Sequence, residues 1–183
     1  MAPKRKLEGE GVDRGGDKKV WSAVITTPFG KMGVRTTPCG TMLDETNFLP
    51  PDSSVVVPPA SNKLAHEAVK ALAAYFVNPK AEFSLPLAPK DCSHHQQLVW
   101  DAMCATPPGQ VKTYGEIARA IGSAAQAVGG ACGSNHFSII IPCHRVVSAT
   151  GIGGFCGRNE DGWQRDVKKW LLRHEGAAVE ETK

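Results

Sequence analysis

Capping boxes mark three helix starts in the second half of the chain. In such a box a Ser or Thr is followed three residues later by Gln or Glu, and each side chain bonds the other's backbone. The boxes begin at Ser93, Thr113 and Ser123. Glycines at Gly122 and near Gly133 follow the second and third predicted helices and can adopt the left-handed conformation that ends a helix. Two short helices that meet at a Gly-Ser junction predict a helix-turn-helix.

The second helix of this pair, residues 124–133, carries almost no bulky side chain. Its sequence, AAQAVGGACG, would let another backbone or the groove of a nucleic acid approach closely. The same composition is typical of a helix packed tightly inside a protein, and composition alone favours that interpretation. The helix pair is weak evidence by itself because any small helical domain contains such pairs.

The first half of the chain has the pattern of a small antiparallel sheet with one helix. β-Branched residues predict strands at 21–27 and 31–36, joined as a hairpin by a Pro-Phe-Gly turn. Residues 50–60 contain four prolines and predict a loop. Apolar residues at helical spacing then predict an amphipathic helix with Ser61 as its N-cap, which Pro79 ends.

A proline-rich segment at 81–91 separates these two patterns and predicts the boundary between two domains. The predicted fold is an α/β (α+β) N-terminal domain with a small antiparallel sheet, followed by a mainly α C-terminal domain that contains the helix-turn-helix. The predicted organisation is a disordered tail at 1–19, the N-terminal domain at 20–90, the C-terminal domain at 91–178 and a second tail at 179–183.

Charge and cysteine spacing restrict the possible functions. The formal net charge of +3 over 183 residues is too small to identify a nucleic-acid-binding protein, so a DNA partner would need positive charge placed locally. The six cysteines lie at irregular intervals, without a CxxC pair or the close Cys/His spacing of structural zinc sites. This predicts reduced thiols and no metal site. A disulfide set is the alternative, but a chain of this length does not need cross-links.

The sequence contains no run of about 18 apolar residues and no pattern of a secretory signal, so we expect no membrane partner. The predicted tail at 1–19 mixes charges of both signs with glycine. Its basic run, Pro3-Lys4-Arg5-Lys6, predicts import into the nucleus, or a cytoplasmic protein if the organism is a prokaryote. The alternative is a solvated tail without a targeting role.

A cysteine next to a histidine ends a short apolar run. Residues 138–142 predict a buried segment that delivers the chain through a proline into Cys143 and His144. The thiolate is the reactive form of cysteine, and a neighbouring base raises its population. Since the side chains of adjacent residues point in different directions, we expect a water molecule to carry the proton between them. The alternative for Cys143 is an inert thiol of the core.

The imidazole of His144 should be held by a carboxylate, by the logic of the Ser-His-Asp triad. Glu175 is the candidate, in the last turn of a helix predicted at 166–175 and ended by Gly176. The helix dipole disfavours a negative charge at that position, which suggests that the residue has a function. The alternative is an exposed carboxylate at a frayed helix end.

The run Ile141-Pro142-Cys143-His144-Arg145-Val146-Val147 resembles the active-site motif of the O6-alkylguanine-DNA alkyltransferases, also called methylated-DNA–protein-cysteine methyltransferases. Further similar segments occur in the family's order and span most of residues 96–176: Trp100, 108–111, 113–118, 127–131, 133–135 and 170–176. The first half is much less similar, with likeness only around 28–31 and at Tyr75-Phe76.

The resemblance implies DNA repair by direct reversal. A methyl or other alkyl group would move irreversibly from O6-alkylguanine in DNA, with O4-alkylthymine as a further candidate substrate, to the acceptor Cys143. Each molecule would act once, as a stoichiometric suicide enzyme without a cofactor. His144 would be the water-linked base, Glu175 its orienting partner, Asn135 a stabiliser of the active-site loop and Tyr114 a proton donor toward the departing guanine.

The resemblance also implies a double-stranded DNA partner, whose minor groove the helix-turn-helix enters while the damaged base rotates into a pocket. The protein would act as a monomer. The DNA-binding residues implied in this way are Tyr114, Ala124, Gln126, Ala127, Gly130, Ala131 and Arg145. The implied substrate pocket is formed by Tyr114, Val146, Phe155, Cys156 and Gly157.

The sequence departs from the family pattern at several positions. Gln126 stands where the family usually has an arginine that fills the gap left by the rotated base, so we expect weaker base flipping or DNA affinity. Cys156 stands where a serine or similar residue is usual, and the segment 158–166 is longer than in relatives. A thiol at this position could form a disulfide or accept an alkyl group itself, although a polar pocket wall is the simpler interpretation. His95 replaces a common Phe without a functional explanation.

Three other functions compete with the transferase. A non-catalytic protein that binds alkylated DNA and marks lesions for other repair factors would resemble this chain but lack the acceptor, so Cys143 discriminates. A Cys-His hydrolase would need an oxyanion hole and an acyl pocket, which a Cys followed directly by His does not suggest. A plain helix-turn-helix regulator leaves the Cys-His-Arg run unexplained.

Overall fold

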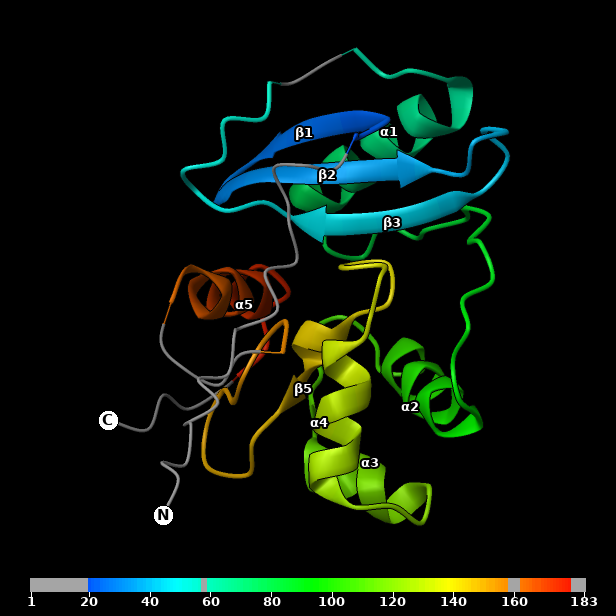
Figure 1. Ribbon diagram of the computed structural model, residues 1–183. Helices are drawn as coiled ribbons and strands as arrows, with labels where there is room; N and C mark the ends of the chain where they lie inside the picture. The colour runs from blue at the N-terminus through cyan, green and yellow to red at the C-terminus, as the bar shows by residue number, and fades with distance from the viewer. Residues whose placement is uncertain (1–19, 57–58, 158–161, 179–183) are drawn as a thin grey trace, which may run out of the picture.

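The computed structural model describes residues 20–56, 59–157 and 162–178 of the chain. Both predicted tails, with the basic run at 3–6, lie outside these described residues. Residues 158–161, the first part of the segment at 158–166 that is expected to be longer than in relatives, lie outside them as well. In Figure 1 the strands β1, β2 and β3 form the upper part of the molecule with α1, and the helices α2 to α5 lie below them together with β5.

The β-branched segments of the first half form the predicted hairpin. β1 (Ala23–Thr27) pairs antiparallel with β2 (Gly30–Thr36). A third strand, β3 (Leu43–Phe48), completes a sheet with the order β1-β2-β3. The sequence does not predict β3, because its Asp, Glu and Asn are depleted in strands. Backbone pairing with β2 and the burial of Leu43 and Phe48 override that preference.

One face of the sheet packs against α1 (Lys63–Val77), which buries Leu72 and Tyr75. The predicted N-cap Ser61 is wrong by one residue. Asn62 caps the helix instead, because its side-chain oxygen accepts a hydrogen bond of 2.9 Å from the backbone nitrogen of Ala65.

Two of the three predicted capping boxes form, at Ser93 and Thr113, and they begin α2 (His94–Cys104) and α3 (Tyr114–Ala120). The third is wrong: α4 (Ala125–Gly133) follows Ala124, which makes no side-chain cap. The hydroxyl of Ser123 lies instead 2.8 Å from Nε2 of His95, on α2. This contact gives His95 a structural role, because it ties the α3–α4 junction to α2.

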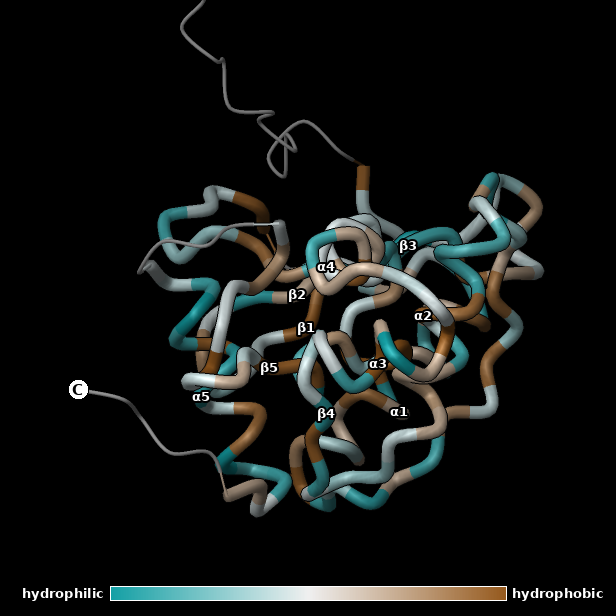
Figure 2. Tube along the Cα trace, turned by 90° about the horizontal axis from the view of Figure 1, so that it is seen from below, coloured by the Kyte–Doolittle hydropathy of each residue, from teal (hydrophilic) through white to brown (hydrophobic). Residues whose placement is uncertain are grey.

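The last part of the chain carries a 3₁₀ turn, η1 (Cys143–Arg145), followed by β5 (Val146–Val147), which pairs parallel with β4 (Lys112–Thr113). The helix α5 (Trp163–His174) begins three residues before the predicted start. Seen from below, β4 and β5 lie between α5 and α3 (Figure 2).

The upper and lower parts share one hydrophobic core. It contains Met32 and Val34 from the sheet together with Val99 from α2 and Leu171 from α5. The predicted boundary near residue 90 is therefore crossed by continuous apolar packing, and the division into two domains stays a prediction.

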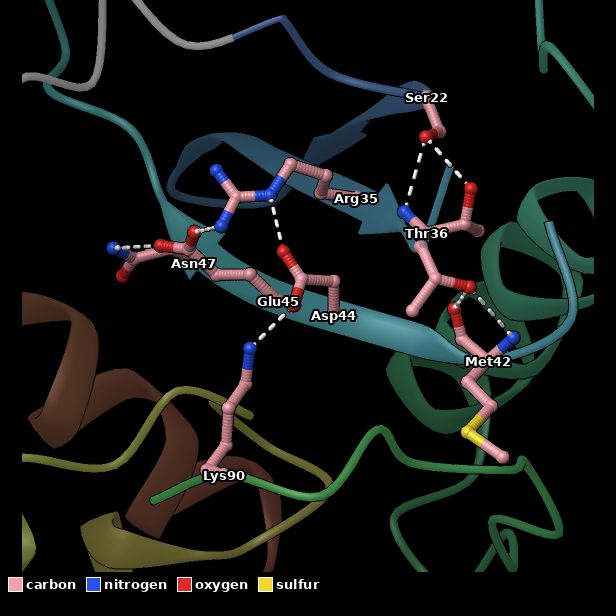
Figure 3. A network of polar contacts seen from close by, with 9 residues as sticks. Ser22, Arg35, Thr36, Met42, Asp44, Glu45, Asn47 and Lys90 are labelled. Atoms are coloured by element: carbon pink, nitrogen blue, oxygen red, sulfur yellow. Dashed lines mark hydrogen bonds and ion pairs between the residues drawn. The ribbon is translucent and has the colours of Figure 1, made fainter. Parts of the chain in front are cut away.

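The segment predicted as a linker lies along the free edge of β3. Leu43 forms a parallel bridge with Leu87. In Figure 3, Lys90 bonds Asp44, which also accepts a hydrogen bond of 2.7 Å from Nε of Arg35. Desolvation opposes ionisation of Asp44, but these two cations hold the pKa of its carboxyl below the usual value. The segment is thus fixed to the sheet by backbone and charge.

Within the described ranges no helix is long and apolar enough to cross a membrane. The same residues contain no group of three or more His, Cys, Asp or Glu arranged to hold a metal ion. The six cysteines are free thiols.

Candidate active site

The segment that leads to Cys143 is held from two sides. Thr46 of β3 donates its hydroxyl to the carbonyl of Ser138 at 3.0 Å, and its backbone pairs with the same segment. Asn135 donates to the carbonyl of Ile141 at 2.8 Å and accepts from the backbone of Phe137 at 2.9 Å. The amide of Asn135 therefore closes the loop that precedes the cysteine, at the position expected for a loop stabiliser.

The thiol of Cys143 is buried, with 6% of the residue exposed. Burial raises the pKa of this thiol, whereas a hydrogen bond from Asn135 and the nearby ammonium of Lys168 lower it. Since burial dominates, the thiol is neutral at rest and needs a base to become a nucleophile.

His144 is fully buried, and its Nε2 lies 2.9 Å from Oε1 of Glu175. An ionised carboxylate can only accept, so Nε2 carries the proton in the tautomer that this contact implies. Among the described residues, Nδ1 of His144 has no hydrogen-bond partner. Burial also lowers the pKa of His144, although Glu175 favours its charged form. The imidazole is therefore neutral, with a free lone pair that can take up a proton.

Glu175 caps the C-terminus of α5 and is 8% exposed. Burial would raise the pKa of its carboxyl, but hydrogen bonds from His144 and Arg145 lower it to about 2. Arg145 donates to both carboxylate oxygens, at 3.0 and 2.8 Å. This cation offsets the unfavourable helix dipole that made Glu175 conspicuous in the sequence.

The expected contact of Arg145 with DNA stays a prediction, and the structure turns this side chain inward. The residue is 9% exposed, and its NH1 donates to the carbonyl of Thr106 at 2.6 Å while the rest of the guanidinium holds Glu175. A guanidinium committed to buried acceptors is poorly placed to reach a phosphate. Nothing in its local sequence distinguishes this inward orientation from an outward one.

Cys143 opens into a cavity of about 570 Å³. Four of the residues predicted to form a substrate pocket, Tyr114, Phe155, Cys156 and Gly157, line this cavity together with Gln126 and other residues of α4. Val146 does not line it, because its side chain packs in the core. A larger cavity of about 1020 Å³ lies between the segment at 80–90 and α2, but neither Cys143 nor His144 is among its lining residues.

The helix α4 has one buried and one exposed face. Ala124, Gln126, Ala127 and Gly130 are exposed, which contradicts the interpretation of a fully packed helix. Ala131 lies on the buried face: it is 3% exposed, and its carbonyl accepts from the Trp100 indole at 3.0 Å, so its expected contact with DNA stays a prediction that this burial does not favour.

Tyr114, at the start of α3, donates its hydroxyl to the carbonyl of Gly154 at 3.2 Å. Burial raises the pKa of this phenol above its usual value.

Residues 154–157, which line the cavity and are called the pocket loop here, lie close to α4. A Cβ on Gly133 would lie 3.2 Å from Cα of Gly157. Small residues in α4 thus let the pocket loop pack beside the helix.

Lys168 is a site residue that the sequence analysis missed. It is fully buried in α5, and its Nζ donates to the carbonyls of Val146 at 2.7 Å and Gly154 at 2.8 Å. Burial lowers the pKa of Lys168 to about 8, although the neighbouring thiols, Cys143 first among them, favour its charged form. The available signal was its spacing, because Lys168 shares a helix face with Leu171 and Glu175.

The chain is similar to known proteins over most of its length. A family described as "6-O-methylguanine DNA methyltransferase, DNA binding domain" matches residues 94–177. A methylated-DNA–protein-cysteine methyltransferase of Methanosarcina acetivorans is 34% identical over 164 residues, which cover 86% of this chain and 99% of that protein. A DNA base-flipping protein of Thermus thermophilus is 32% identical, covering 84% and 98%. The crystal structure of Mycobacterium tuberculosis OGT in complex with DNA is similar with a TM-score of 0.66 and 34% identity, covering 84% of this chain and 91% of that one.

Proposed function

This chain belongs to the methylated-DNA–protein-cysteine methyltransferase family, and we propose that it repairs DNA by moving an alkyl group from O6 of guanine onto Sγ of Cys143. The observation that carries the proposal is the buried Cys143 thiol, which opens into a cavity rimmed by α4 and is backed by His144 and Glu175. The cavity volume of about 570 Å³ lies within the usual range for a site that takes a small molecule or base.

In the proposed reaction, a water molecule passes the proton of the Cys143 thiol to Nδ1 of His144. The sulfur then attacks the alkyl carbon in line, a carbon–sulfur bond forms, and the bond between that carbon and O6 breaks with its electrons going to guanine. Tyr114 donates a proton toward the departing base, and the phenolate that remains is reprotonated through solvent as the imidazolium of His144 releases its proton. The net result is that guanine gains the proton that the thiol loses. A thioether has no easy route back to a thiol, so each molecule acts once.

The proposed partner is double-stranded DNA. We infer that α3 and α4 act as a helix-turn-helix whose exposed α4 face, with Ala124, Gln126, Ala127 and Gly130, enters the minor groove of the duplex. The alkylated guanine would leave the base stack and enter the cavity beside Cys143. The similarity to a relative crystallised in complex with DNA supports a DNA partner. The minor-groove orientation and action as a monomer are part of the proposal.

Intact-protein mass spectrometry tests the proposal directly. After incubation with an excess of duplex containing O6-methylguanine, the wild-type protein should gain the mass of a single methyl group, and Cys143→Ala should gain none. Peptide mapping should place the label on Cys143. A label on Cys156 would instead identify that pocket thiol as the acceptor.

A second candidate is a protein that binds alkylated guanine without transferring the group. The similarity to a DNA base-flipping protein, at 32% identity, motivates it. The same experiment separates the two functions, because this alternative predicts binding of the duplex with an unmodified wild-type protein. Placement of the protein in the nucleus through residues 3–6 also remains a proposal, to be tested by deleting that run and following localisation.

A further inference from the structure

We propose that Tyr75, from α1, positions the carboxylate of Glu175 and thereby sets the basicity of His144; the inference rests on the function proposed above. Tyr75 is fully buried and donates its hydroxyl to Oε1 of Glu175 at 2.8 Å, across 100 positions of sequence. The upper part of the molecule thus contributes one polar group to the proton relay of Cys143.

Three donors converge on the same carboxylate oxygen. Oε1 of Glu175 lies 2.9 Å from Nε2 of His144, 2.8 Å from NH2 of Arg145 and 2.8 Å from the hydroxyl of Tyr75. A carboxylate oxygen has about two lone pairs to share, so these donors compete. The negative charge that Glu175 presents to His144 therefore depends on whether the hydroxyl of Tyr75 is present.

The position of the Tyr75 hydroxyl is fixed by contacts of the residue's backbone and of its ring. The backbone carbonyl of Tyr75 lies 2.8 Å from Nε2 of His174, whose ring stacks on Trp170 at 4.7 Å. The Tyr75 ring also packs against Phe83, with ring centroids 5.8 Å apart. Burial and the adjacent Glu175 raise the pKa of Tyr75, so the phenol stays protonated and acts only as a donor toward the carboxylate.

The expected direction follows from the groups that face His144. Glu175 favours the imidazolium, whereas Arg145 and Lys168 disfavour it. Removal of the Tyr75 hydroxyl leaves more negative charge on Oε1 and strengthens the interaction that favours the imidazolium. The pKa of His144 should rise, and less of the neutral base should be available at a given pH.

The variant Tyr75→Phe isolates this effect because it removes only the hydroxyl. The rate of single-turnover methyl transfer from an O6-methylguanine duplex, measured against pH, should show its acid limb moved upward by about half a unit to one unit. At pH values on the acid limb, the rate of the variant should be about threefold to tenfold lower than that of the wild type at the same pH. The reason is that one unit of pKa changes the population of the neutral base about tenfold. The matched control is Thr36→Val. It removes another buried hydroxyl, which lies 3.0 Å from the hydroxyl of Ser22, just before β1 (Figure 3), and accepts a hydrogen bond of 2.9 Å from Asn62. Its pH profile should superimpose on the wild type.

Two further measurements keep the inference distinct from a general loss of stability. In the background Glu175→Gln, adding Tyr75→Phe should cause no additional shift, because the hydroxyl acts through that carboxylate. Nitrogen NMR of the histidine rings in the free protein should show a raised His144 pKa in Tyr75→Phe. Unchanged titration of His144 together with an unchanged pH profile would overturn the inference. If the wild type transfers no methyl group, the proposed function fails, while the ring titration still decides the role of Tyr75.

Discussion

At the scale of single residues, the candidate site depends on buried charges that compensate one another. Glu175 is ionised beside Arg145, and Lys168 supplies positive charge beside the thiols. The Cys143-His144 pair and Glu175 could be predicted from the sequence, because adjacency and helix position reveal them. Tyr75 could not, because its role arises from a contact between elements that only folding brings together. For Lys168 the helical spacing with Glu175 was the one signal, and its hydrogen bonds to Val146 and Gly154 appear only in the fold.

Replacing Lys168 with Met tests the charge beside the thiols. The variant keeps the length of the side chain but removes the donor to Val146 and Gly154 and the cation near Cys143. Without it the pKa of the thiol should rise further, and the rate of methyl transfer should fall about tenfold for each unit of that rise. Loss of hydrogen bonds from a charged group should lower the free energy of unfolding by about 1–3 kcal/mol. Part of this loss is offset because the variant no longer buries an ammonium group, which costs desolvation energy.

The matched control for this prediction is Lys169→Met, the same chemical change one position along α5. Lys169 is half-buried and does not line the cavity beside Cys143. It is also outside the carboxylate cluster, which consists of Glu175 and its donors Tyr75, His144 and Arg145. Equal transfer rates in the Lys168→Met variant and the control would remove Lys168 from the site.

At the scale of elements, local signals predicted most of the helices but not how they are capped. The boxes at Ser93 and Thr113 form, whereas Ser123 bonds His95 instead of capping α4. The hairpin follows from β-branched residues, but β3 is stabilised by its pairing and burial in spite of its polar composition. Tertiary contacts thus override local preference where a residue has a competing partner or a strand has a buried face.

The exposed face of α4 makes the substitution Gln126→Arg informative. Gln126 is exposed and lines the cavity, so a longer, charged side chain there could fill the space left by a rotated base. We expect tighter binding of lesion-containing duplex or faster repair, by about threefold to tenfold, equivalent to roughly 1 kcal/mol. The measurement is single-turnover methyl transfer at several duplex concentrations.

A charge-matched control separates this local effect from general attraction to DNA. Gln97→Arg adds the same charge on α2, at a residue that lines the larger cavity and is absent from the lining of the smaller one. If both variants change the rate equally, or neither does, the arginine has no special role at position 126.

At the scale of the whole molecule, the active-site cluster joins segments that are far apart in the sequence. Tyr75, His144 and Glu175 come from different elements, and one hydrophobic core surrounds them. The sequence predicted two structural patterns with a linker between them, but the contacts across that boundary depend on side chains that pair only after collapse. Unfolding should therefore expose the carboxylate cluster and the core together.

The stability of the protein should fall with acid because of this cluster. The folded pKa of Glu175 is about 2 against an ordinary 4.5, so its contribution is complete above pH 4.5 and is lost as the pH falls toward 2. The difference corresponds to about 3 kcal/mol at most. His144 adds to the loss below pH 6.5, because burial lowers its pKa and the unfolded chain takes up the proton first.

Urea unfolding at a series of pH values measures this dependence. In Glu175→Gln the free energy of unfolding should be lower at pH 7, because Arg145 loses its counterion, but it should change less between pH 4.5 and 2. A variant with the same acid dependence as the wild type would show that other carboxylates control acid unfolding.

The way β3 is covered has a consequence for solubility. A strand with one unpaired side can recruit a strand from another molecule, which begins aggregation or an unintended dimer. Here Leu43 pairs with Leu87 and Thr46 with Phe137, so backbone groups of the same chain occupy that side of the sheet. The two segments around Leu87 and Phe137 thus also block intermolecular strand addition at β3.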